Sequence, residues 1–131
     1  MKPSSELLAY FKDHEDQIQA FAQILATRGI ERGLIGPKEG DRIWERHIAN
    51  SIPVTTLIPQ GVRVVDIGSG AGLPGIVIAL ARPDLKMTLV EPLQRRVDFL
   101  IEVVAELDLP IEVIRSRAEM VKKQFEVITA R

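Results

Sequence analysis

Several glycines and one acidic residue lie close together in the middle of this 131-residue chain. The acid is Asp66, near the end of an apolar run, and the glycines that follow it are Gly68, Gly70, Gly72 and Gly75. Glycine adopts positive φ angles easily and lets a ligand approach the backbone closely. Where such a turn leads into a helix, backbone N–H groups and the helix dipole attract an anionic group. The spacing therefore predicts a loop that holds a nucleotide-like cofactor.

Two classes of cofactor loop fit this stretch. Residues 70–75 match the G-x-G-x-x-G pattern of dinucleotide-binding loops. In that pattern, however, the first glycine follows the strand almost directly, whereas here Asp66 and Gly68 come first. A carboxylate at this position would repel a pyrophosphate but suits a cofactor that carries an ammonium and a sulfonium group. Asp66 therefore favours S-adenosyl-L-methionine, and with it methyl transfer, over NAD.

A second acidic residue, Glu91, stands at the end of the next apolar run. At the carboxyl end of a strand, its carboxylate is expected to accept hydrogen bonds from both hydroxyls of a ribose. Both classes of cofactor contain a ribose, so Glu91 does not separate them. The two acids at successive strand ends do argue against a turn that merely connects a strand to a helix.

The hydrophobic pattern predicts the elements that position these residues. The first 60 residues form a helical extension, with a helix over 5–27, a second over about 38–51 and a short helical turn at 53–59. From residue 62, strands and helices alternate. Strands are predicted at 62–67, 87–90, 111–114 and 125–129, and helices at 75–81, 93–107 and 117–123.

This alternation predicts an α/β fold, a Rossmann-like parallel sheet with helices on both faces, as in class I S-adenosylmethionine-dependent methyltransferases. The division is residues 1–60 as an N-terminal helical extension and residues 61–131 as the methyltransferase part. A doubly wound sheet normally continues past a fourth strand, because an open edge pairs readily with other strands. We therefore expect 61–131 to be the N-terminal part of a longer domain, with an incomplete sheet.

The composition excludes several kinds of chemistry. The chain contains no cysteine, so disulfides, thiolate nucleophiles and cysteine metal sites are absent. His14 and His47 are too far apart in sequence for a local metal site, and we expect no metal. No run approaches the roughly 20 apolar residues of a membrane span, and residues 1–20 lack the pattern of a signal peptide. We expect a cytoplasmic protein without membrane contact. The sequence does not predict its oligomeric state.

Residues 65–75 closely resemble the RsmG (GidB) family of ribosomal RNA methyltransferases, including the distinctive Gly-Leu-Pro-Gly at 72–75. Further segments are similar to motifs of the same family, at 46–51, 91–100, 115–119 and 127–131. The resemblance covers roughly residues 30–131. It departs at residues 33–36, where the family usually has an Asn-Leu-Thr-like stretch, and it lacks the family's C-terminal part.

The resemblance implies S-adenosyl-L-methionine-dependent methylation of guanine N7 in 16S rRNA of the small ribosomal subunit. It also implies roles for individual residues around the cofactor. Gly68 and Leu73 would contact the cofactor through the loop, together with Gly70 and Gly72. Glu91 would hold the ribose, and Asp66 would act through the loop and the cofactor's amino end. Ala118 and Glu119 would flank the adenine, and Arg131 would line the site between cofactor and RNA.

No catalytic residue is predicted. Guanine N7 already carries a nucleophilic lone pair, so alignment of the reactants would suffice. The net charge of −1 gives no overall basic field to attract RNA. Two alternatives remain, an NAD-binding Rossmann oxidoreductase and a non-catalytic fragment that binds no cofactor. Arg46 and His47 fit either the rim of the pocket or ordinary helix packing.

Overall fold

The computed structural model describes residues 2–121 and 124–131. Its centre is a parallel sheet with the strand order β3-β2-β1-β4. The strands are β1 (Arg63–Ile67), β2 (Lys86–Glu91), β3 (Glu112–Arg115) and β4 (Val127–Ala130). Each predicted strand lies within two residues of these bounds. Because all strands run the same way, their carboxyl ends meet at one edge of the sheet.

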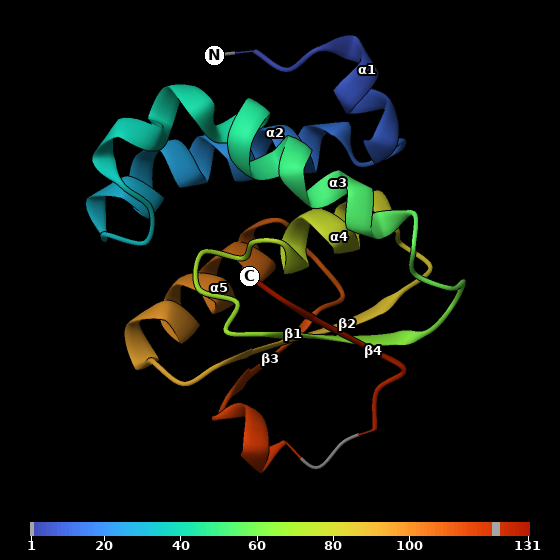
Figure 1. The fold of residues 1–131 in the computed structure, drawn as a ribbon. Coiled ribbons are helices and arrows are strands. Elements are labelled where there is room, and N and C mark those ends of the chain that lie inside the picture. The colour runs from blue at the N-terminus through green and yellow to red at the C-terminus, as the bar shows by residue number, and fades with distance from the viewer. Residues whose placement is uncertain (1, 122–123) are drawn as a thin grey trace.

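The crossover helices α4 (Gly75–Ala81) and α5 (Gln94–Glu106) pack on the same face of the sheet (Figure 1). The connection from β3 to β4 crosses the opposite face. The predicted α/β class and parallel sheet are confirmed. Within the described residues, that opposite face carries less helix than predicted, the single turn Ala118–Met120. Residues 122–123 of the predicted helix lie outside the described residues.

The predicted single helix over 5–27 is wrong, because the chain breaks in its middle. It forms α1 (Ser5–Leu8), a tighter turn at Ala9–Phe11 and α2 (Glu15–Ile24), which continues as a wider helical turn at Leu25–Gly29. Between the turn and α2, Asp13 has a φ angle of +66°. Aspartate enters the left-handed region at less cost than most residues, and this conformation ends a right-handed helix.

The second helical segment is longer than predicted. It runs from a tight turn at Pro37–Arg42 through wider turns at Ile43–Ile48 into α3 (Ala49–Thr55). Pro53 lies inside α3 and does not begin a separate turn. The Ser51 hydroxyl donates to the His47 carbonyl at 2.9 Å, within this same stretch of helix. Such side-chain bonds help a helix to accommodate an irregular backbone.

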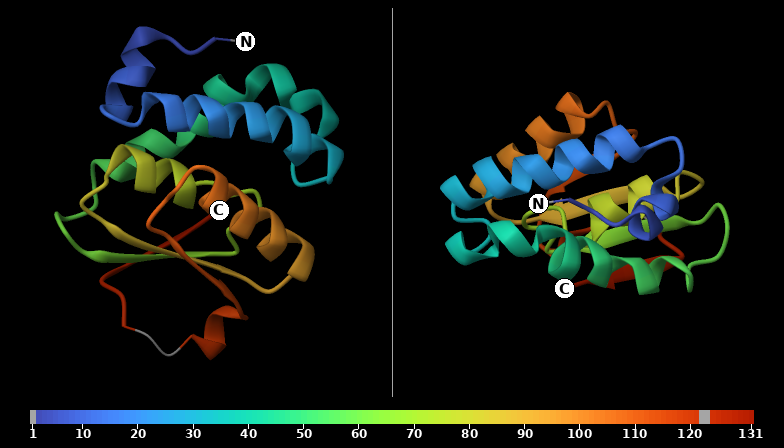
Figure 2. Two further views of the ribbon diagram at one scale, coloured as in Figure 1. Left: turned by 180° about the vertical axis from the view of Figure 1, so that it is seen from behind. Right: turned by 90° about the horizontal axis from the view of Figure 1, so that it is seen from above.

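The molecule has three layers, which Figure 2 shows from two further sides. The N-terminal helices lie over α4 and α5, and these in turn cover the sheet. Buried apolar side chains from all three layers form a continuous core, with Phe21 from α2, Ile76 from α4 and Leu89 from β2 among its members. Burial of this apolar surface holds the N-terminal helices against the sheet part.

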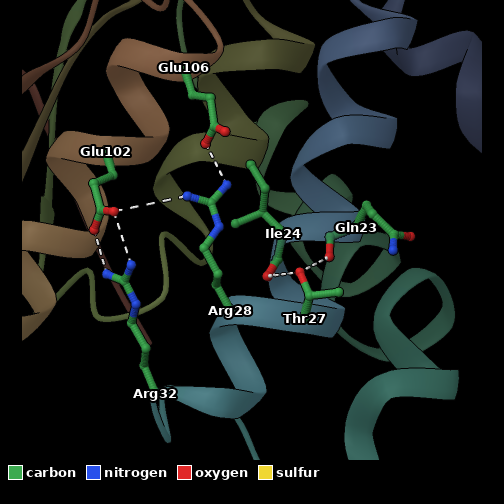
Figure 3. Close-up of polar contacts among 7 residues, drawn as sticks. All are labelled: Gln23, Ile24, Thr27, Arg28, Arg32, Glu102 and Glu106. Carbon is green, nitrogen blue, oxygen red and sulfur yellow. Dashed lines mark hydrogen bonds and ion pairs between the residues drawn. The ribbon is translucent and has the colours of Figure 1, made fainter.

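Ion pairs fasten the N-terminal helices to α5 at the surface (Figure 3). Arg32 pairs with Glu102, with Nη2 and Oε1 2.9 Å apart, and Arg28 pairs with Glu106 and approaches Glu102. These side chains are substantially exposed, so water screens their attraction. We conclude that they orient the helices and that the apolar core supplies most of the binding between the layers.

Candidate functional site

The glycine loop follows β1 and leads into α4 at the carboxyl edge of the sheet. Gly68, Gly70 and Gly72 have φ angles of +68°, +53° and +91°. Residues other than glycine rarely adopt positive φ angles, so the predicted need for glycine at these positions is confirmed. The Gly68 N–H donates to the carbonyl of Val90 in β2 at 2.8 Å, which ties the start of the loop to the neighbouring strand.

Glu91 holds the middle of this loop. Its side chain is only 2% exposed. Oε1 accepts a hydrogen bond from the Gly70 N–H at 2.9 Å, and Oε2 accepts one from the Leu93 N–H at 3.1 Å. The guanidinium of Arg96 lies 4.0 Å from Oε1. A carboxylate can accept about four hydrogen bonds, so these two leave acceptor positions for a ligand.

Asp66 fastens the end of the loop from beneath. Its side chain is fully buried. Oδ2 accepts from the Gly75 N–H at 3.2 Å, and Oδ1 accepts from the Thr129 hydroxyl of β4 at 2.9 Å. Burial raises the pKa of the Asp66 carboxyl, and these hydrogen bonds oppose that rise. The Asp66 carboxylate therefore connects β1, β4 and the start of α4.

A cavity of about 310 Å³ opens between the loop and the helical extension. The loop contributes residues 68–71 and Leu73, the end of β4 contributes Arg131, and the extension contributes residues 34–36 with Glu39 and His47. Sequence reasoning missed this contribution from residues 34–36 and Glu39. The signal available in the sequence is the pair of glycines at 33 and 36, which marks a loop without revealing where that loop packs.

The predicted cofactor residues do not all meet at this cavity. Gly68, Gly70, Leu73 and Arg131 line it. Asp66 and Glu91 do not line the cavity but accept hydrogen bonds from the loop backbone, at Gly75 and Gly70 respectively. Gly72 faces the core, where a Cβ atom would lie 2.5 Å from Ile76 Cδ1. Ala118 and Glu119 are exposed on their turn beyond β3 and do not line this cavity.

His47 lies between two charged side chains of the cavity wall, Glu39 and Arg131. It is 8% exposed, and its Nδ1 lies 2.8 Å from Nη2 of Arg131. A guanidinium only donates hydrogen bonds, so Nδ1 must be the acceptor and the ring is neutral. On the other side of the ring, Nε2 lies 3.5 Å from Oε2 of Glu39. Burial, and then the charge of Arg131, lower the pKa of His47.

This lowered pKa predicts a specific dependence of stability on pH. Because the pKa in the folded chain lies below the ordinary value of 6.5, the unfolded chain takes up the proton first as the pH falls. The stabilisation from neutral His47 is therefore present above pH 6.5 and is lost as the pH falls through the folded pKa. In urea unfolding between about pH 8 and pH 5, the free energy of unfolding should fall less on acidification in His47→Gln than in the parent chain. Equal pH dependence in both proteins would contradict this assignment.

His47 and Arg131 also line a neighbouring cavity of about 450 Å³, on the side of α3 and β4. Its other walls include Asn50, Val54 and Pro74. The two side chains thus stand at the boundary between the cavities. Within the described part of the chain, no group of three or more His, Cys, Asp or Glu side chains could hold a metal ion. No helix among those residues is long and apolar enough to cross a membrane.

A family model and curated relatives match most of this chain. The family model described as rRNA small subunit methyltransferase G (GidB) matches residues 14–131. A ribosomal RNA small subunit methyltransferase G of Mycobacterium sp. (strain JLS) is 52% identical over 134 residues, covering 98% of this chain and 59% of the relative. The protein of that name from Mycobacterium marinum is 58% identical over 111 residues, covering 85% and 49%. The chain spans about half the length of these relatives.

Solved structures agree on the fold. A putative RNA methyltransferase from Pyrococcus horikoshii matches with a TM-score of 0.54 at 20% identity, over 63% of this chain and 43% of that one. A putative protein-L-isoaspartate O-methyltransferase from Plasmodium falciparum, in complex with S-adenosyl-L-homocysteine, matches with a TM-score of 0.51 at 19% identity, over 63% and 47%. At this identity the likeness establishes the Rossmann-like methyltransferase fold alone.

Proposed function

This chain belongs to the rRNA small subunit methyltransferase G (GidB) family, and from that premise we propose that it serves the methylation of guanine N7 in 16S rRNA by S-adenosyl-L-methionine. The substrate is then the small ribosomal subunit, and the site of action is the cytoplasm. The observation that carries the proposal is the cavity between the glycine loop and the helical extension, which Arg131 also lines, with Glu91 bonded to the loop at Gly70.

The residues that line this cavity and those that hold its loop in place fit the cofactor. Glu91 has acceptor positions to spare for the two ribose hydroxyls. A Cβ atom on Gly68 would meet nothing within 4 Å, so the backbone there faces open space that a ligand can enter. Arg131 offers guanidinium donors to a carboxylate. Asp66 serves the site through the loop, by fixing Gly75 at the start of α4.

Ala118 and Glu119 would have to reach the adenine from their exposed turn. Gly70, Gly72 and Leu73 shape the loop on which the cofactor would lie. We propose these contacts on the family resemblance.

The chemistry asks little of the chain beyond positioning. S-adenosyl-L-methionine supplies an electrophilic methyl group when bound. Guanine N7 needs no base to activate it, so the contribution of the chain is to hold both reactants in line. Arg131 stands between the two cavities and is suited to hold a phosphate or the guanine edge beside the cofactor. Base contact in RNA usually requires an unstacked nucleotide, which predicts a loop or a junction as the substrate.

A thermal-shift titration of the 131-residue chain tests the proposal. S-adenosylhomocysteine at about 100 times its Kd should stabilise the fold by about 2.7 kcal/mol, which raises Tm by several degrees. NAD should have no effect at the same concentration. Protection by NAD in place of S-adenosylhomocysteine would identify an oxidoreductase. Protection by neither ligand would identify a module that binds no cofactor.

A further inference from the structure

The proposed cofactor carries an ammonium group at its amino acid end, and that group needs an acidic partner. Asp66 is fully buried beneath the loop, bonded to Gly75 and Thr129, and does not line the cavity. We propose that Glu39, from the helical extension, binds the ammonium group of the cofactor. The inference rests on the proposed function, because it names the partner of one group of that cofactor.

Glu39 has the position and the unused capacity for this role. It lies in the turn Pro37–Arg42 and lines the same cavity as the loop residues Gly68 and Gly70. Its side chain is 25% exposed. Oε1 accepts from Arg46 at 3.3 Å, whereas the buried Oε2 accepts no hydrogen bond and faces only Nε2 of His47, at 3.5 Å. A buried acceptor left unpaired is unfavourable, and an ammonium group at this carboxylate would relieve that.

The order of charges along the cavity wall is complementary to the ammonium and carboxylate groups of an amino acid. Glu39 is negative, His47 beside it is neutral, and Arg131 on the far side of the ring is positive. An α-amino acid presents an ammonium and a carboxylate group close together. Glu39 can take the first and Arg131 the second, with the imidazole as the spacer between them. The negative end of this row would repel a pyrophosphate, which argues for the amino acid cofactor over a dinucleotide.

The competing interpretation is that Glu39 only pairs with Arg46. The Arg46 side chain is 54% exposed, and it does not line the cavity. Exposed ion pairs of this kind contribute little to stability. Arg46→Gln therefore provides a matched control, because it removes the same pair and leaves the Glu39 carboxylate in place.

Isothermal titration calorimetry with two ligands tests the assignment. S-adenosylhomocysteine carries the amino acid end, whereas 5′-methylthioadenosine keeps the adenine, the ribose and the sulfur but lacks that end. Glu39→Gln should weaken S-adenosylhomocysteine binding by about tenfold or more, because it removes one partner of a charge-assisted bond. It should change the Kd of methylthioadenosine by less than about twofold, as should Arg46→Gln for both ligands.

The outcomes separate this inference from the function on which it rests. Unchanged S-adenosylhomocysteine affinity in Glu39→Gln would overturn the inference and leave the proposed function standing. Equal weakening of both ligands, or the same loss in Arg46→Gln, would also overturn it, since either result shows a structural role. If the unsubstituted chain fails to bind S-adenosylhomocysteine, the proposed function fails as well.

Discussion

Replacing Gly75 with alanine should lower the free energy of unfolding by about 2–3 kcal/mol, as expected for overpacking in a dense core. Gly75 begins α4 directly against β1 and β2. A Cβ atom there would lie 2.4 Å from Leu89 Cδ2 and 2.6 Å from Asp66 Oδ2. Neither neighbour can retreat easily, because Leu89 is fully buried and Asp66 is tied to Thr129. The added methyl group must therefore push α4 away from the sheet.

Urea unfolding at pH 7 measures this effect, and Gly29→Ala is the matched control. At Gly29 the nearest atom to an added Cβ, Leu25 Cδ2, lies at an ordinary 3.6 Å. Alanine also favours helix over glycine by about 1 kcal/mol, so the control should be unchanged or slightly more stable. If both variants unfold at the same urea concentration, the close packing of α4 on β1 that we describe is wrong.

Sequence reasoning succeeded where the signal is local. The strand that ends at Ile67 and the glycines that follow are neighbours in the chain, so their types and spacing record the turn directly. Helix α4 has the predicted bounds for the same reason, since it begins at a glycine immediately after Pro74. The positive φ angles at Gly68, Gly70 and Gly72 correspond to this local pattern.

Sequence reasoning failed where packing between distant segments determines the position of a residue. Glu39 reaches the cavity only because the helical extension folds over the loop, and no local pattern records that approach. The helical periodicity likewise continues past Asp13, although the backbone turns there. The contact of His47 with Arg131 joins residues 84 positions apart, so the sequence could not decide between packing and function for His47.

Replacing Glu91 with glutamine should have the largest effect on ligand binding, a loss of about 100-fold in affinity for S-adenosylhomocysteine. Glutamine matches glutamate in size but presents an NH₂ group where a carboxylate oxygen now accepts from Gly70 or Leu93. Two donors then face each other, which destabilises the loop with and without ligand. The variant also removes the negative charge of the carboxylate that, in our proposal, accepts hydrogen bonds from the ribose hydroxyls. Hydrogen bonds to a charged group are worth about 1.5–3 kcal/mol each, and a binding loss near 3 kcal/mol corresponds to about two factors of ten in Kd.

Calorimetric titration of S-adenosylhomocysteine measures this loss, and thermal unfolding without ligand checks that the fold survives. Glu106→Gln removes the same charge from an exposed position at the end of α5, where the partner is Arg28, and should bind the ligand like the parent. Glu91 acts on both loop and ribose, so its substitution should also weaken 5′-methylthioadenosine, unlike Glu39→Gln. Retention of parental affinity for both ligands by Glu91→Gln would show that the cofactor does not depend on the end of β2. Glu91, the last residue of β2, would then serve the loop alone.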